Sequence, residues 1–148
     1  PDTVVLSRDT GYQRNYEFDP YGDYGPRRGY YANRNTLFPP LATDDRFHPK
    51  DVFVGTRGPG WILAIEKSAV ESAGLFEAGA FLAVYDTELD AVYVYHNPDQ
   101  RSFEMDSGTV TGPDGHYPPS GLPLARVMAF DVMWFGWAGF YPDTIVFS

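Results

Sequence analysis

The feature that most constrains this chain is a short sequence that occurs at both of its ends. Residues 1–7 read PDTVVLS and residues 142–148 read PDTIVFS, so five of the seven positions are identical. The other two positions exchange one apolar residue for another. Pro-Asp-Thr followed by β-branched residues is typical of a turn that leads into a short strand. The copies begin 141 residues apart, which is too long for a solenoid and indicates a duplicated domain. The alternative is chance, because Pro-Asp-Thr is common turn chemistry.

The two copies differ in what precedes them. Residues 131–141 read DVMWFGWAGFY and hold two of the three tryptophans, whereas the first copy begins at residue 1 without a methionine. The simplest interpretation is that the chain is a fragment or a processed product. We therefore expect a longer parent protein, in which another aromatic segment precedes Pro1.

Length and composition favour one domain with a hydrophobic core. A chain of 148 residues, of which 43% are hydrophobic and 17% aromatic, is long and apolar enough to bury one. Proline and glycine are spread between the apolar runs, which indicates many turns and short strands. We predict a mainly β fold with two short helices (β-rich α+β). It forms a single domain at residues 51–148, preceded at residues 1–50 by a short strand at residues 4–6 and a long irregular N-terminal arm rich in Tyr, Gly and Pro.

The charge of the chain excludes some classes of partner. A net charge of −9 argues against nucleic acid and against anionic membrane surfaces. The chain has two lysines and nine arginines against fourteen aspartates. A surface rich in Asp and poor in Lys stays hydrated at high salt. We therefore expect a halophilic source, with an ordinary acidic protein as the alternative.

Two absences in the sequence bound its chemistry and location. The chain has no cysteine, which excludes disulfides, thiolate metal sites and cysteine nucleophiles. No apolar run approaches the roughly eighteen residues of a membrane-spanning helix, so we expect no membrane insertion. A chain that begins inside a motif can have lost a signal peptide. We expect an extracellular or cell-surface location.

Tyrosine is the characteristic residue of the predicted arm. Residues 16–31 read YEFDPYGDYGPRRGYY and hold five tyrosines. A long irregular segment usually indicates disorder, but large amphipathic rings bury area when they order on a surface. We expect the arm to pack on the body of its own chain or on a partner protein, with a flexible tail as the alternative. The residues expected to dock on a partner are Tyr16, Tyr21, Tyr24, Arg27, Arg28, Tyr30 and Tyr31.

From residue 51 the pattern becomes that of a globular domain. Two strands joined at Gly-Pro-Gly are predicted within residues 51–65. Residues 66–74 predict a short helix, capped by Ser68 with Glu71 at capping-box spacing and ended by Gly74.

The clearest element is a hairpin at residues 80–96, with its turn at residues 87–90. Weaker strands are predicted at residues 102–105 and 109–111. Residues 112–121 read as a loop of turn residues.

The C-terminal part is predicted to hold an apolar strand, a helix and a final strand. The first strand covers residues 122–130, Asp131 caps a helix at residues 132–140, and residues 145–147 form the last strand. The two helical tryptophans are three residues apart and share a face, which indicates packing on a sheet; a ligand pocket is the alternative. Glycines 136 and 139 would let another backbone approach closely. The residues expected to anchor this end are Trp134, Trp137, Phe140, Pro142 and Asp143.

The order of these segments resembles the family catalogued as domain of unknown function 3179. Residues 41–55, 61–74 and 82–95 resemble that family's lead-in, its strand with a short helix, and its hairpin. MWFGWAGFYPDTIVF, at residues 133–147, resembles its C-terminal signature of spaced tryptophans followed by Pro-Asp-Thr. Residues 1–24 resemble the join that follows the same signature in longer members.

This resemblance covers most of the chain and implies that it is the second half of a two-part protein. Longer members carry a cysteine-containing motif in their first half. Nothing in this chain can match that motif, so the resemblance transfers no functional residue.

Acidic clusters offer the only metal-ligand patterns. Asp86, Glu88 and Asp90 alternate like the oxygen ligands of a calcium loop, but the glycine and the distal glutamate of such a loop are missing. We interpret them as a solvated turn, and Asp19 and Asp23 in the same way, with cation binding as the alternative.

Other patterns suggest no chemistry. His48, His96 and His116 lack metal-ligand spacing. We interpret the first and last as surface residues, and His96 as a strand-end residue that could meet Asp99 or Glu104. Residues 55–60 read GTRGPG, which lacks the Lys-Ser/Thr of a phosphate loop and indicates a hairpin turn.

The sequence therefore presents no convergent catalytic set and no cofactor site. Our first hypothesis is a non-enzymatic structural or assembly module, whose N-terminal arm docks on a second copy or on the other half of its parent protein. The alternative is a ligand- or metal-binding half of an enzyme or redox protein, whose active residues lie in a missing first half.

Overall fold

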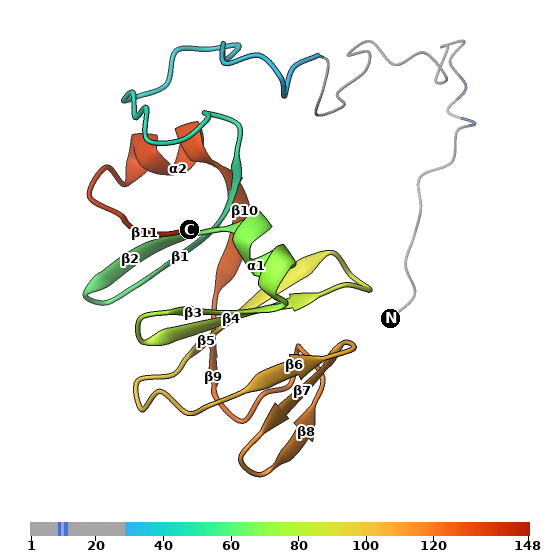
Figure 1. The fold of residues 1–148 in the computed structure, drawn as a ribbon. Helices are drawn as coiled ribbons and strands as arrows, with labels where there is room; N and C mark the ends of the chain where they lie inside the picture. Colours follow the sequence, from blue (N-terminus) through green and yellow to red (C-terminus); the bar gives the residue numbers. More distant parts are fainter. Residues whose placement is uncertain (1–8, 10, 12–28) are drawn as a thin grey trace. The chain divides into compact units, whose positions relative to one another are not determined.

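The computed structural model describes residues 9, 11 and 29–148 (Figure 1). The chain divides into two compact units, residues 1–33 and residues 34–148. In the first unit, the rings of Tyr30 and Tyr31 meet edge to face with their centroids 5.8 Å apart. The strand expected near Val4 lies outside the described residues. Residues 34–50, which the sequence assigns to the arm, belong to the same compact unit as residues 51–148.

The second unit is β-rich, as predicted. Within the described part of the chain there are eleven strands in three sheets and two helices. Their bounds are β1 Val52–Gly58, β2 Trp61–Glu66, α1 Lys67–Ala73, β3 Leu75–Ala78, β4 Phe81–Asp86, β5 Ala91–His96, β6 Glu104–Asp106, β7 Thr109–Gly112, β8 Gly115–Tyr117, β9 Ala125–Val127, β10 Ala129–Met133, α2 Trp134–Phe140 and β11 Ile145–Phe147.

The three sheets are built almost entirely from antiparallel neighbours. The first sheet has the order β10-β1-β2-β11, the second β3-β4-β5-β9 and the third β6-β7-β8. Among the described strands, the pairing of β11 with β2 is parallel, and it sets Val146 opposite Ala64. The C-terminal strand is thus the edge strand of this sheet, and it pairs with β2, which lies about 80 residues earlier in the sequence.

The sheets stack as layers, so the central strands are buried on both faces. In Figure 1, α2 lies above the first sheet, and the second and third sheets follow below it. Neighbouring residues of β1 point to opposite sides, because successive strand residues alternate: Phe53 packs with α2, and Val54 packs toward the second sheet. In β4, Phe81 faces the first sheet and Leu82 faces the third.

Several local predictions are confirmed. The hairpin of residues 80–96 forms as β4 and β5, with Asp90 at a positive φ of 49° in its turn. The helix predicted at residues 66–74 is α1, and it ends at Gly74 with φ 72°. GTRGPG joins β1 to β2 as a hairpin, with Gly60 at φ 85°. The final strand appears as β11.

Other local predictions are wrong. Ser68 does not cap α1, because Glu66 is the N-cap residue and makes no side-chain cap, and the Ser68 hydroxyl donates to the Glu66 carboxylate instead. The loop predicted at residues 112–121 contains β8. The strand predicted at residues 122–130 breaks at Met128, where the chain crosses from the second sheet to the first and the Thr56 hydroxyl donates to the Met128 carbonyl oxygen.

The expected helix cap is also wrong. Asp131 lies within β10, which pairs with β1 as far as Met133, and α2 begins only at Trp134. The first amides of α2 need no side-chain acceptor, because those of Trp134 and Phe135 donate to the backbone carbonyls of Asp51 and Pro49.

Candidate functional site

The repeated Pro-Asp-Thr sequence has a defined structural role at the C-terminus. The Thr144 side chain is buried, and its hydroxyl accepts a hydrogen bond from Trp137 Nε1 (3.0 Å) and donates to the Ile62 carbonyl oxygen (3.3 Å). The Thr144 amide closes the preceding turn on the Tyr141 carbonyl oxygen. One hydroxyl therefore ties α2 to β2 at the point where β11 begins.

The two tryptophans of α2 lie in the core. Trp137 packs on β1 at Gly55, where a Cβ atom would come within 2.5 Å of the indole ring. Trp134 is completely buried and meets the rings of Phe47 and Phe53 at centroid distances of 5.0 and 4.9 Å. Glycine is therefore required at position 55, since no larger residue leaves room for the indole.

Phe140 does not share this packing, so the expectation that it anchors the helix is wrong. Its side chain is 70% exposed. At 100° per residue, position 140 lies roughly 120° around the helix from Trp134, outside the buried face. The expected anchors Pro142 and Asp143 form the exposed turn that precedes Thr144.

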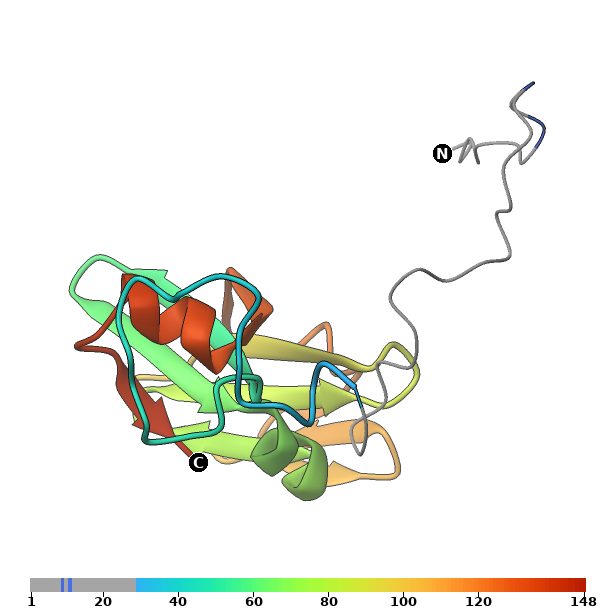
Figure 2. The same cartoon turned by 90° about the horizontal axis from the view of Figure 1, so that it is seen from above.

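Residues 34–50, which we call the strap, cross over α2 (Figure 2). The buried Lys50 donates from Nζ to the Asn35 carbonyl oxygen at 2.7 Å. Trp134 Nε1 donates to the Asp44 carbonyl oxygen at 3.2 Å. Arg46 binds the Asp44 carboxylate through two nitrogens, and this hydrogen bonding lowers the pKa of Asp44 below its ordinary value. The Lys50 and Arg46 contacts close the strap on itself, whereas Trp134 Nε1 and the Phe135 amide, which donates to the Pro49 carbonyl oxygen, fasten it to α2.

The backbone of the strap lies near one of the two helix glycines, at a distance that would also leave room for a Cβ atom. A Cβ atom built on Gly139 would meet Leu41 Cβ at 3.7 Å and the backbone nitrogens of Leu41 and Ala42 at 3.8 and 3.9 Å. For Gly136 the expectation is wrong, because the neighbour there is the side chain of Val132 on the same segment.

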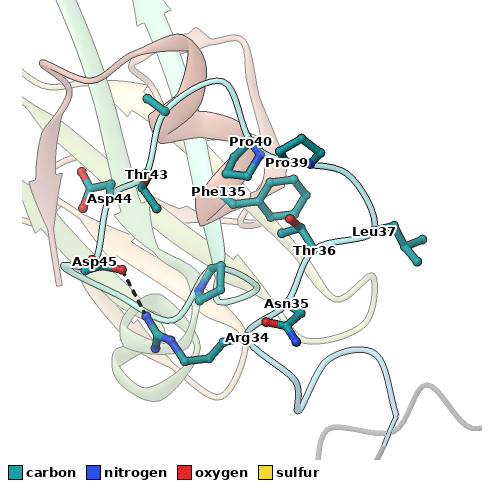
Figure 3. A pocket seen from close by; sticks show the side chains of 12 residues that line it. Arg34, Asn35, Thr36, Leu37, Pro39, Pro40, Thr43, Asp44, Asp45 and Phe135 are labelled. Atoms are coloured by element: carbon teal, nitrogen blue, oxygen red, sulfur yellow. Dashed lines mark ion pairs between the residues drawn. The ribbon is translucent and has the colours of Figure 1, made fainter.

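A pocket of about 430 Å³ opens between the strap and α2 (Figure 3). Its apolar wall is formed by Phe135, Pro39 and Pro40, and its rim carries Arg34 paired with Asp45 at 3.7 Å. The volume suits a small organic group such as an aromatic ring. The remaining lining residues are Asn35, Thr36, Leu37, Ala42, Thr43, Asp44 and Pro49.

Four large apolar side chains of the strap and of α2 are exposed to solvent. Leu37, Phe38 and Leu41 of the strap are 76%, 81% and 77% exposed, and Phe140 is 70% exposed. Leu41 lies against Gly139, the residue before Phe140. We call these four residues the apolar face. Several large exposed apolar side chains within one fastened segment are typical of an interaction surface.

A cluster of carboxylates surrounds Lys67, one of the chain's two lysines. Its Nζ lies 2.8 Å from Asp131 Oδ2 and 3.1 Å from Asp90 Oδ1, with Glu71 at 3.9 Å. Burial works to lower the pKa of Lys67, but the hydrogen bonds to Asp131 and Asp90 outweigh it and raise the pKa above its ordinary value. A lysine held in its charged form is a structural tie between α1, β10 and the β4–β5 turn, and not a nucleophile.

The calcium-like triplet has other roles in the described structure. The Asp86 carboxylate accepts hydrogen bonds from the amides of Glu88 and Leu89. The Asp90 carboxylate binds Lys67 and accepts from the Tyr85 hydroxyl, and the Lys67 contact lowers its pKa. No group of three or more acidic or histidine side chains in the described residues is placed to hold a metal ion. Asp19 and Asp23 lie outside that part.

The histidines have ordinary structural contacts. His48 Nδ1 accepts from the Lys50 amide, the ring of His96 packs 5.2 Å from that of Phe81, and His116 Nδ1 lies 3.0 Å from the Thr111 hydroxyl. Each contact is local to a turn or a strand pair, so none of them brings the histidines together.

Of the predicted docking residues, Tyr30 and Tyr31 are described and lie in the first compact unit. Tyr16, Tyr21, Tyr24, Arg27 and Arg28 lie outside the described residues. The apolar face was not among the sites predicted from the sequence. The pattern that could have indicated it is FPPL at residues 38–41, where a phenylalanine and a leucine flank two prolines. Two adjacent prolines exclude a helix interior and a central β-strand, so these apolar side chains cannot be assigned to the core of either element.

Comparison with known proteins gives one match. The model of a family described as "Protein of unknown function (DUF3179)" matches residues 1–144. Searches of curated proteins and of solved structures returned no match for this chain. No helix in the described part is long and apolar enough to cross a membrane.

Proposed function

This chain belongs to the DUF3179 family, a family of unknown function, and we propose that it acts as a non-enzymatic assembly module. In this proposal, residues 1–33 of one copy, the part of the N-terminal arm that precedes the strap and that we call the arm from here on, dock on the apolar face and pocket of a second copy. The observation that carries it is the apolar face itself. Three of its four large side chains stand on the strap, which is fastened to α2, and the fourth is Phe140 of α2; each is at least 70% exposed.

The pocket beside the apolar face suits the side chains of the arm. Phe135 and the two prolines offer flat apolar surface for a tyrosine ring. The arm supplies Tyr16, Tyr21 and Tyr24 as rings of the right size. The two prolines belong to the strap, which is fastened to α2, so this wall is organised before a partner arrives, which lowers the entropic cost of binding.

Charge supports the same pairing. Residues 34–148 carry seven lysines and arginines against fifteen aspartates and glutamates, a net charge of −8. The arm places Arg27 and Arg28 next to its tyrosines. Asp45, at the rim of the pocket, has a side chain that is 87% exposed. Residues 24–31 of the arm carry two arginines and no acidic residue, so this basic and aromatic stretch suits an acidic and apolar surface and favours both encounter and register.

The test is the self-association of the full chain, measured by sedimentation equilibrium over a wide concentration range. We expect association that weakens about 10-fold or more in Phe38→Ser and in Phe140→Ser, because each removes an apolar side chain worth about 1.5–3 kcal/mol when buried. The charge reversal Arg27→Glu with Arg28→Glu is expected to weaken it as well, most strongly at low salt.

Leu89→Ser is the matched control. Leu89 is 66% exposed but lies in the β4–β5 turn, away from the apolar face. It should leave association unchanged. A chain that stays monomeric at every concentration, or a control that loses as much association as Phe38→Ser, would contradict the proposal.

A further inference from the structure

The repeat at the two ends of the chain can be interpreted through the contacts of its C-terminal copy. In that copy, Pro142 and Asp143 form the turn, Thr144 bridges Trp137 and Ile62, and β11 then runs parallel to β2. The first copy keeps Pro, Asp, Thr and the final Ser. The conserved positions are thus the ones that set the turn and the buried hydroxyl bridge.

The two positions that differ are the ones where the structure tolerates change. Ile145, which corresponds to Val4, is 57% exposed. Phe147, which corresponds to Leu6, is half-buried and packs against the core between the first and second sheets. The tip of its ring lies 3.4 Å from where a Cβ atom of Gly79 would be. Val146 packs with the α2 core and is valine in both copies.

From this correspondence we infer that Pro1–Ser7 is a second strand of the β11 type, whose binding site is the groove between β2 and α2 of another domain of this fold. In that groove Thr3 takes the hydrogen bonds of Thr144, and Val4–Leu6 pair in parallel with the strand equivalent to β2. Binding by strand addition is a common way for one chain to complete the sheet of another. The inference goes beyond the proposed assembly function, because it names a different segment and a different binding site.

The test uses this chain as the acceptor. In the full chain, Val146→Pro removes a backbone donor and weakens the pairing of β11 with β2. Thermal unfolding, followed by tryptophan fluorescence, is then measured with added peptides. PDTIVFS reports whether the groove is open, PDTVVLS is the test peptide, and PDVVVLS lacks the threonine hydroxyl.

We expect PDTIVFS and PDTVVLS both to raise the Tm in a concentration-dependent way. PDVVVLS should bind about 10-fold more weakly or worse, because the buried indole N–H of Trp137 then has no acceptor. A rise with PDTIVFS but none with PDTVVLS would overturn the inference, as would equal rises with PDTVVLS and PDVVVLS.

If neither peptide reaches the groove, the N-terminal sequence can be tested by introducing it at the β11 position of the chain itself. Ile145→Val with Phe147→Leu places the N-terminal sequence at the β11 position of the full chain. We expect a Tm within about 5 °C of the unaltered protein, since both changes are between apolar residues of similar shape. A fall as large as that of Val146→Pro would overturn the inference.

These readouts do not depend on self-association. A monomeric chain whose groove accepts PDTVVLS would contradict the proposed docking on the apolar face and leave the strand inference standing. A chain that associates through the apolar face, but whose groove rejects PDTVVLS, would support the proposed docking and contradict the strand inference.

Discussion

Replacement of Thr144 by valine removes one buried hydroxyl and changes little else. Valine has nearly the shape of threonine, and it suits the strand conformation that follows. The hydroxyl is the acceptor for Trp137 Nε1 at 3.0 Å and the donor to the Ile62 carbonyl oxygen at 3.3 Å. Together the two bonds join α2, through Thr144 at the start of β11, to β2. The change therefore acts on the junction that the repeated sequence forms.

The magnitude follows from the groups that lose their partner. The Trp137 side chain is 2% exposed, so water cannot replace the lost acceptor. A buried donor without a partner costs about 1–3 kcal/mol, and the lost bond to Ile62 adds to this. We expect a loss of about 2–3 kcal/mol in the free energy of unfolding, which lowers the Tm by about 4–12 °C for a chain of this length.

Urea and thermal unfolding of Thr144→Val, followed by tryptophan fluorescence, measure this loss. Thr109→Val is the control, because Thr109 lies exposed on β7. Its unfolding free energy should stay within about 0.5 kcal/mol of the unaltered protein. Equal stability of the two variants would refute the argument that the Thr144 hydroxyl bridge holds α2 and β11 on the sheet.

Three further predictions concern the core and the Lys67 cluster. Gly55→Ala puts a Cβ atom into the ring of Trp137 and should cost about 1–3 kcal/mol in the free energy of unfolding, as measured by urea denaturation. Lys67→Met should cost about 1–2 kcal/mol in the same assay, less than a fully buried pair because Asp131 and Asp90 are partly exposed, and high salt should reduce the difference. The pKa of Asp90 is lowered on folding, first by Lys67 and then by Tyr85, so its contribution is present above the unfolded value of about 3.9 and is lost as the pH falls through the lowered pKa. The stability difference between the unaltered chain and Asp90→Asn, measured by urea unfolding across the acid range, should therefore vanish at low pH, and a difference that persists there would contradict the assignment.

Elements whose signal lies in neighbouring residues could be predicted from the sequence. The β4–β5 hairpin follows from two apolar runs around a short polar turn, and the end of α1 follows from Gly74. Both are set by local backbone preferences. The burial of Trp134 and Trp137 likewise follows from their spacing on a helix.

Elements that depend on distant partners could not be predicted. Asp131 has the composition of a helix cap, but its partner is Lys67, 64 residues away in the chain. The amides that it was expected to cap are satisfied by the carbonyls of Pro49 and Asp51 instead. The break at Met128 arises from the passage between two sheets, which no local pattern marks.

The candidate site was the least predictable part for the same reason. Leu37, Phe38 and Leu41 are held on the domain surface because the Trp134 indole and the Phe135 amide fasten the strap to α2. Neither contact has a sequence signature. Phe140 is exposed because of its angular position on α2, which the run of aromatic residues around it obscures.

The central claim, that the arm of one copy docks on the apolar face of another, can be tested directly because the chain has no native cysteine. Copies carrying Tyr24→Cys are mixed with copies carrying Leu37→Cys and treated with a short thiol-specific cross-linker, and the yield of mixed dimers is compared with that from Tyr24→Cys and Leu89→Cys. We predict efficient cross-linking for the first pair and only background for the second. Equal yields from the two pairs would contradict the account.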